Sequence, residues 1–185
     1  MAFWSTERLE PKRQHRWYVS FGSGVLDGLR YALKKVDKPK AEISTVEHKW
    51  LNHTFNYPGR LTWQDINMTF ASVSDPDATN LLDVVLERSG YRRPQGISDV
   101  DIAPNGVAVT TIGKAKMNAV IGQFDIIQVN PDGQEIEKWT IYKPLFTNVE
   151  FGSLEYANED IVEISCTVKY DWAQLNGQTV PTAGR

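Results

Sequence analysis

The chain has 185 residues, of which 41% are hydrophobic and 23% are charged, and its formal net charge is −3. These values are typical of a folded globular domain rather than of a disordered protein. A length of 185 residues suits one domain, which we expect to cover residues 1–185. No apolar run approaches the roughly 18 residues of a membrane span, and residues 1–17 lack the apolar core of a signal peptide. We therefore expect the protein to be made and assembled in a cytoplasm.

The first 14 residues are expected to form a basic arm. Residues 1–40 contain nine basic residues (Lys or Arg) and four acidic residues (Asp or Glu). Residues 41–185 contain eleven basic and nineteen acidic residues. Such an arm could be solvated, could bind nucleic acid, or could pair with the acidic face of the next identical subunit. Self-pairing is favoured over nucleic acid because an acidic body repels phosphate. Arg13 and Arg16 are the candidate contact residues.

Strand patterns follow the arm. Trp17, Val19 and Phe21 alternate with other side chains at a period of two, which predicts a strand. The glycine-rich residues 22–28 predict a loop. Residues 29–36 are ambiguous between a helical turn and a strand, and we favour a strand because the alternation resumes soon afterwards.

The middle of the chain predicts an extended hairpin. Alternation begins near residue 40, and large side chains fall on both sides of the segment, which suits an element that a partner covers. Pro58 and Gly59 indicate a turn. A further strand should then bury Ile66, Met68 and Phe70. The predicted interface residues of the hairpin are Val46, His48, Trp50 and Asn52, which would share one strand face, together with Phe55 and Tyr57.

One amphipathic helix is predicted with its N-cap at Asp75, Pro76 at its first position and Gly90 at its end. A short helix could lie within residues 110–122, and an Asp-Gly hairpin should join the strands within residues 124–142. The last strand is expected to alternate without interruption from Val162 to Trp172, and residues 173–185 are expected to be a mobile tail.

The sequence contains no recognisable catalytic constellation. It has no phosphate-binding loop, no zinc-protease motif and no nucleophile elbow. His48 and His53 are five residues apart, which fits neither one helix face nor one strand face. The acidic pairs Asp99/Asp101 and Glu159/Asp160 fall in predicted loops, where we expect solvated carboxylates. The lone Cys166 excludes an internal disulfide and is expected to be a small buried side chain. We therefore predict no enzyme, no metal and no cofactor.

The stretch "FTNVEFGSLEYANEDIVEISCTVKYDW", residues 146–172, resembles the C-terminal end of bacteriophage tail tube proteins of the contractile-tailed type. In that family a phrase of the form "lwPtnVgfgeLdys.sneive" leads into a final strand that closes on Tyr-Asp-Trp. Residues 47–70 resemble the family's mid-chain hairpin and the strand that follows it, and the helix after "SDPDA" lies where the family inserts its single helix. The matching positions of the C-terminal phrase are Pro144, Val149, Leu154, Tyr156, Glu159, Ile161, Val162, Glu163, Tyr170 and Trp172.

This resemblance implies a mainly β fold, an antiparallel sandwich or barrel with one flanking α-helix and an extended mid-chain hairpin. Subunits would close into hexameric rings that stack into a tube, with the hairpin near residues 46–58 reaching a neighbouring ring. The implied partners are other copies of the chain, a contractile sheath, baseplate and tail terminator proteins, and DNA that passes through the lumen of the virion's tail. Alternatives are a baseplate tube initiator, the tube of a related injection system, or a monomeric β-sandwich that binds a carbohydrate or peptide.

Overall fold

The computed structural model describes residues 11–22, 26–74, 77–91, 111–157 and 159–176. Within these ranges the chain forms ten strands, two α-helices and one 3-10 helix. The strands are β1 (Trp17–Phe21), β2 (Leu33–Val36), β3 (Lys40–Trp50), β4 (His53–Gln64), β5 (Ile66–Ala71), β6 (Phe124–Val129), β7 (Glu135–Tyr142), β8 (Leu145–Glu150), β9 (Glu163–Lys169) and β10 (Trp172–Asn176). The helices are η2 (Asp27–Tyr31), α1 (Ala78–Arg88) and α2 (Lys114–Ile121).

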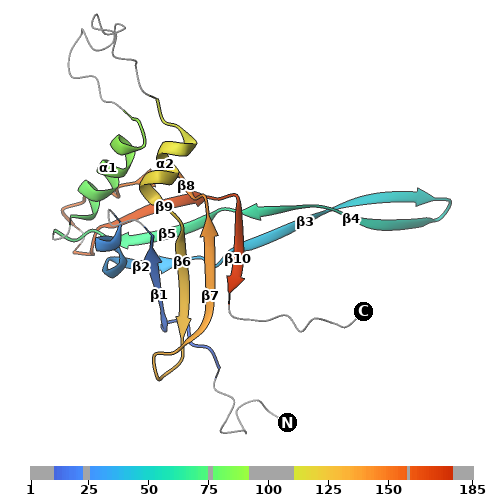
Figure 1. Ribbon diagram of the computed structural model, residues 1–185, viewed down its shortest axis with the longest axis horizontal. Helices are drawn as coiled ribbons and strands as arrows, with labels where there is room; N and C mark the ends of the chain where they lie inside the picture. The colour runs from blue at the N-terminus through green and yellow to red at the C-terminus, as the bar shows by residue number, and fades with distance from the viewer. Residues whose placement is uncertain (1–10, 23–25, 75–76, 92–110, 158, 177–185) are drawn as a thin grey trace, which may run out of the picture.

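The strands form two four-stranded sheets and a separate hairpin. One sheet has the order β1-β6-β7-β10 and the other has the order β2-β5-β9-β8, while β3 pairs only with β4. All of these pairings are antiparallel. The strands of the two sheets run across one another (Figure 1). The prediction of a mainly β, antiparallel fold with an extended hairpin is thus confirmed.

A single cluster of buried apolar side chains joins both sheets and both α-helices. The alternation of β5 places every second side chain in this cluster, so the predicted burial of Ile66, Met68 and Phe70 is confirmed. The other sheet contributes β-branched and aromatic side chains, and the helices contribute their apolar stripes. Core residues outside β5 include Val19, Phe124, Ile126, Ile141, Ile164, Cys166, Val168, Leu82, Val85, Met117 and Ile121.

Helix α1 begins two residues later than predicted. Its N-cap is Asp77, whose carboxylate accepts a hydrogen bond from the Thr79 N–H at 3.0 Å. Both Asp75 and Pro76 lie outside the described residues. The sequence offered two aspartates within three positions, and spacing alone did not separate them. Gly90 has φ +108°, which confirms the predicted left-handed end of the helix.

Two flanking α-helices lie within the described residues, where one was predicted. The second, α2, confirms the short helix considered for residues 110–122, and it packs beside α1 and close to β8. Met117 and Ile121 of α2 enter the common core.

The last predicted strand is divided between the two sheets. β9 pairs with β5 and β8, whereas β10 pairs with β7 in the other sheet. The chain turns at Tyr170 and Asp171, where the Asp171 N–H donates to the Tyr142 carbonyl at 3.2 Å and the Asp171 carboxylate accepts from Lys114 at 2.6 Å. Residues 173–176 belong to β10, so the prediction of a mobile tail from residue 173 is wrong for these four.

The predicted strand over residues 29–36 is wrong in its first half. Residues Asp27–Tyr31 form the 3-10 helix, and the strand begins at Leu33. Leu29 is completely buried, and its carbonyl accepts from the Ala32 N–H at 3.0 Å. A helical turn that buries one leucine therefore outweighs the strand-like pattern of the segment.

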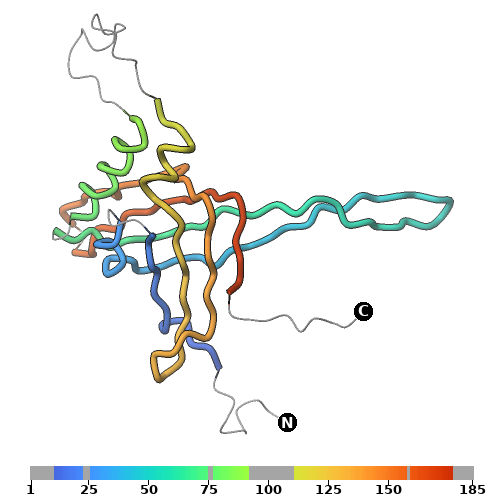
Figure 2. The backbone as a smooth tube through the Cα atoms, in the orientation of Figure 1, coloured from blue at the N-terminus to red at the C-terminus, as the bar shows by residue number. Residues whose placement is uncertain are grey.

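The β3–β4 hairpin extends the β2–β5 pair away from the body (Figure 2). Val36 of β2 faces Met68 of β5, and Lys40 of β3 faces Gln64 of β4, so the register continues unchanged across the short connections. Between these pairs the Asp37 N–H donates to the Asn67 carbonyl at 3.0 Å. The hairpin is therefore an outgrowth of one sheet rather than a separately attached loop.

Candidate assembly interface

The outer half of the β3–β4 hairpin has two chemically different faces. Partners directly opposite each other in an antiparallel ladder lie on the same face. Three such pairs are apolar or aromatic, and we call these six residues the aromatic face. The pairs of the aromatic face are Val46 with Tyr57, His48 with Phe55, and Trp50 with His53. The alternating pairs, Glu47 with Asn56 and Lys49 with Thr54, are polar and form the opposite face.

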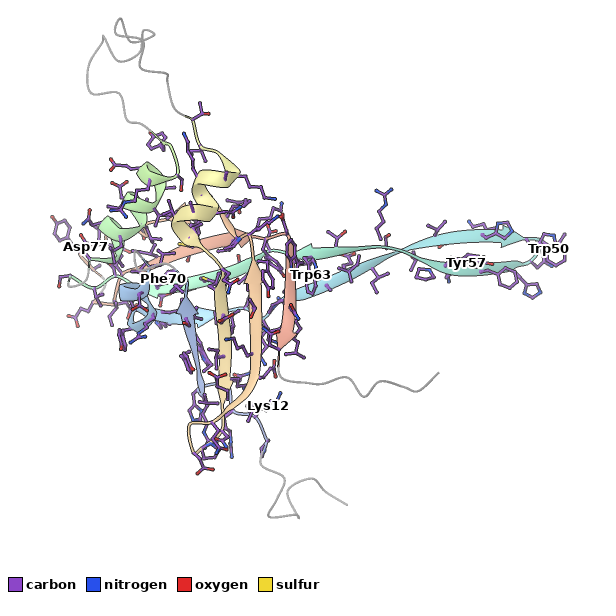
Figure 3. The ribbon with its side chains drawn as sticks, in the orientation of Figure 1. Lys12, Trp50, Tyr57, Trp63, Phe70 and Asp77 are labelled. Atoms are coloured by element: carbon purple, nitrogen blue, oxygen red, sulfur yellow. The ribbon has the colours of Figure 1, made fainter. Side chains whose placement is uncertain are left out.

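The aromatic face is open to solvent. The exposed fraction is 60% for Val46, 63% for Trp50, 47% for Phe55 and 56% for Tyr57. Figure 3 shows Trp50 and Tyr57 on the outer part of the hairpin, far from Trp63 at its base. Contiguous exposed apolar groups of this kind are typical of a surface that binds another protein.

A β-bulge fixes the register of this face. Ile43 faces Leu61 and Thr45 faces Pro58, so Gly59 and Arg60 together oppose Ser44. The Ser44 hydroxyl accepts from the Arg60 N–H at 2.9 Å. A Cβ atom at Gly59 would lie 2.3 Å from the Ser44 Oγ and 2.9 Å from its carbonyl oxygen. The prediction of a turn at Pro58 and Gly59 is therefore wrong, because both residues lie within β4 at the bulge.

The turn of the hairpin is formed by Leu51 and Asn52. Asn52 was predicted to share a strand face with Trp50, and this is wrong because β3 ends at Trp50. Leu51 is 84% exposed and has φ +52°, a conformation that residues other than Gly, Asn and Asp rarely adopt. The sequence lacks the Asn-Gly or Asp-Gly pair that would have marked this turn.

The two histidines lie on the same face of the hairpin. His48 and His53 belong to opposite strands, and the His53 ring centroid lies 6.5 Å from that of Phe55. The sequence interpretation treated the segment as one strand through residue 52 and therefore separated them. Among the described residues, no group of three His, Cys, Asp or Glu side chains could hold a metal ion.

Arg13 and Arg16, the predicted basic contact residues, lie on the body of the subunit and not on the hairpin. The Arg13 carbonyl accepts from the Gln128 side-chain amide at 3.1 Å, and the Arg16 carbonyl accepts from the Val129 N–H at 3.1 Å. Lys12 beside them forms an ion pair with Glu137. Residues 12–16 are therefore attached to the sheet, and Figure 3 shows Lys12 far from Trp50. The structure does not bring Arg13 or Arg16 to the aromatic face of the same subunit.

A second exposed apolar surface was not predicted as an interface. The connection between β8 and β9 carries Leu154, Tyr156 and Ile161, which are 88% exposed, fully exposed and 68% exposed, respectively. The same residues contributed to the family resemblance in the sequence, so that phrase was the available signal.

The cysteine and the acidic pairs noted in the sequence do not form a reactive site within the described residues. Burial raises the pKa of the Cys166 thiol to about 12, so the thiolate form that reacts is scarce at neutral pH. Glu159 and Asp160 are exposed in the β8–β9 connection, while Asp99 and Asp101 lie outside the described residues. No helix in the described ranges is long and apolar enough to cross a membrane.

Comparisons with protein-family models and with curated proteins give no match. Solved structures do match. A chain of the anti-feeding prophage (AFP) baseplate superposes with a TM-score of 0.61 at 11% identity, over 91% of this chain and 97% of that chain. This chain has the fold of proteins from contractile injection systems.

Two further structures support the same fold. The sheath/tube terminator structure of the extracellular contractile injection system PVC matches with a TM-score of 0.58 at 15% identity, over 91% of this chain and 98% of that chain. The tube terminating cap of AFP matches with a TM-score of 0.59 at 13% identity, over 96% of this chain and 100% of that chain. The predicted resemblance is confirmed at the level of the fold, and the matched proteins are structural parts rather than enzymes.

Proposed function

We propose that this chain is a tail tube subunit of a contractile-tailed bacteriophage. Copies of it would form hexameric rings, and the rings would stack into a hollow tube inside the sheath. The observation that carries the proposal is the aromatic face of the hairpin, which projects from the body and which no described residue covers. Soluble monomers rarely expose a contiguous apolar surface of this kind, whereas a repeating assembly would bury it in every subunit.

The sheet edges also support a repeating assembly. Within the described structure, β8 and β10 each pair with a neighbour on one side only. Unpaired edges invite uncontrolled strand pairing, and closing subunits into a ring would cover them. Ring closure would therefore satisfy backbone groups that the single subunit leaves to water.

The conduit function belongs to the same proposal. With a net charge of −3, the chain could line a channel with more carboxylates than cations, along which DNA would slide without adhering. Sheath, baseplate and terminator proteins would be the other partners, and the mature location would be the virion tail. Val46, His48, Trp50, Phe55 and Tyr57 would contact the next ring, and Arg13 and Arg16 would lie near a neighbouring subunit.

Negative-stain electron microscopy across a concentration series tests this proposal. We expect rings at low concentration and hollow tubes of uniform width at higher concentration. Isolated small particles at every concentration would contradict it, and a saturable carbohydrate or peptide ligand on such a monomer would favour a β-sandwich binding module.

A position at an end of the tube is the second candidate. It is favoured because the matched structures include a baseplate, a sheath/tube terminator and a terminating cap. A baseplate initiator or terminator should form single rings that do not stack without another protein. Single rings that persist across the concentration series would therefore select this alternative.

A further inference from the structure

A groove lies beside the connection between β8 and β9, residues 151–162. Its volume is about 860 Å³. Both apolar and acidic side chains line it, and the main ones are Leu154, Tyr156, Ile161, Glu155, Asp160 and Glu163. Lys34 also lines the groove, where its ammonium forms an ion pair with Glu163. The lining therefore offers exposed apolar contact area together with an excess of carboxylates.

The hairpin tip has complementary properties. Trp50 and Leu51 are 63% and 84% exposed, so the tip carries large apolar side chains on a narrow projection. His48 and His53 lie on the same face as Trp50, and each imidazole has a ring N–H that can donate a hydrogen bond. Lys49 lies on the polar face, where it forms an ion pair with Glu47 at 3.9 Å. Leu51 occupies the turn although its left-handed φ of +52° is unfavourable for a residue with a branched side chain. The turn therefore presents a large apolar side chain to solvent at a position where glycine or asparagine would fit the backbone more easily.

We propose that the hairpin tip of one subunit docks into the β8–β9 groove of a second copy of the chain. Trp50 and Leu51 would pack against Leu154, Tyr156 and Ile161, while donors at the tip would face the groove carboxylates. This inference rests on the proposed function, since it names the surface that receives the hairpin when rings stack.

The occupant is a second copy because the two surfaces lie at opposite ends of the molecule. The tip and the β8–β9 connection occupy the two ends of the longest axis, so a subunit's own tip cannot reach its own groove (Figure 1). Contacts between two different patches are heterologous, and they generate an open head-to-tail series when no rotation closes them. That series is the geometry of a stack.

A narrow hairpin tip in one groove is a small contact, and small contacts between two free proteins are typically weak. A ring, however, would present all of its tips to all of the grooves of the next ring. After the first contact the others become intramolecular, and their effective concentration rises to the millimolar range. Docking would thus be weak between monomers and strong between rings, which favours ordered stacking over random aggregation.

Site-directed cross-linking tests the contact. Leu51→Cys at the tip and Leu154→Cys at the groove are substitutions of side chains that are more than four-fifths exposed, so both variants should fold. The native Cys166 is 1% exposed and will not compete for the disulfide. The two variants are purified reduced, mixed under assembly conditions and oxidised. As a matched control, Leu51→Cys is mixed with Asp132→Cys, whose thiol lies in the exposed turn between β6 and β7.

We expect a disulfide-linked dimer in the tip–groove mixture at least tenfold more abundant than in the tip–control mixture. Electron microscopy of the wild-type protein under the same conditions reports on stacking independently. Wild-type tubes together with equal cross-linking in both mixtures, or with tip–tip dimers predominating, would overturn the docking and leave the tube proposal intact. The absence of both assembly and selective cross-linking would overturn both.

Discussion

At the scale of single residues, Glu137 joins parts of the chain that lie far apart in sequence. Its carboxylate accepts from Lys12 of the N-terminal segment, from Lys38 at 2.7 Å and from the Trp139 indole at 2.7 Å. Burial raises the pKa of the Glu137 carboxyl, but the hydrogen bonds from Lys12, Lys38 and Trp139 together outweigh burial and lower the pKa to about 2. The ionised form therefore helps to hold residues 12–16 on the sheet.

Glu137→Gln should lower the free energy of unfolding at pH 7 by about 1–3 kcal/mol, because the amide cannot replace the ion pairs. A carboxyl whose pKa is lowered by folding stabilises the protein above its ordinary value of 4.5, and that contribution is lost as the pH falls toward 2. The difference between wild type and variant should therefore shrink between pH 4.5 and pH 2.

Urea unfolding at a series of pH values measures this difference. The control is Glu87→Gln on the exposed side of α1, which should change stability by no more than about 0.5 kcal/mol. A difference that stays constant down to pH 2 would show that the ionised carboxylate is not responsible.

At the scale of elements, the hairpin is a hydrogen-bonded pair of strands, β3 and β4, that carries the exposed aromatic face. Its strands are 11 and 12 residues long, and their side chains are almost all exposed, so the hairpin adds little to the core. Its exposed side chains are therefore available for contact with another molecule. Substitutions on it should separate assembly from folding.

Phe55→Asp should abolish tube growth while the subunit remains folded, because it places a charge in the middle of the aromatic face. Trp50→Asp should act in the same way. Sedimentation velocity and electron microscopy would report assembly, and circular dichroism would report folding. The matched control is Thr54→Asp, one residue away on the polar face. Normal polymerisation of Phe55→Asp would remove the aromatic face from the interface.

Gly59→Ala should disturb the bulge, because the added Cβ would lie 2.3 Å from the Ser44 Oγ. Beyond the bulge, a slip by one residue would move the aromatic side chains to the other face. We expect faster amide exchange over residues 45–57, lost assembly and a nearly unchanged melting temperature of the body. Gly113→Ala is the control, since a Cβ there has no neighbour within 4 Å. Unchanged amide exchange in the Gly59→Ala hairpin would show that the bulge tolerates a side chain.

At the scale of the whole molecule, one core links both sheets. Val168 is 1% exposed and lies on β9 between Ile66 of β5 and Phe146 of β8. Val168→Asp would bury an unpaired carboxylate and should cost about 3–5 kcal/mol, enough to unfold many domains of this size. Both sheets should then be lost together, with coincident transitions in circular dichroism and tryptophan fluorescence.

Ser165→Lys, on the exposed side of the same strand, provides the comparison and should be close to neutral. A soluble Val168→Asp variant with wild-type stability would mean that the core tolerates a charge at this position.

The sequence predicted the elements whose side chains follow one period between clear boundaries. The first strand, β5 and the Asp-Gly hairpin belong to this group, as does α1 apart from its first turn. It could not show that the chain passes to the other sheet after Tyr170, because the apolar residues continue at a period of two from β9 to Trp172. The burial does not follow that period: Trp172 is 41% exposed, and Ala173 of β10 packs against the core instead. The strand pattern placed Val46, His48 and Trp50 on one face, which their paired residues of β4 share in the structure. It did not reveal the bulge or the turn at Leu51, because Pro58 and Gly59 indicated a turn at the wrong place.

The path of the chain through the hairpin also determines how the subunit would bear load. Asp65 alone separates β4 from β5, and β5 lies between β2 and β9 in its sheet. A pull on the tip along the hairpin axis would enter the middle of the sheet parallel to the strands. The hydrogen bonds on both sides of β5 would then share the force at once, in shear, instead of opening one after another. In an assembly whose subunits contact one another through the hairpin tip, an axial load would therefore pass along β5 rather than across it.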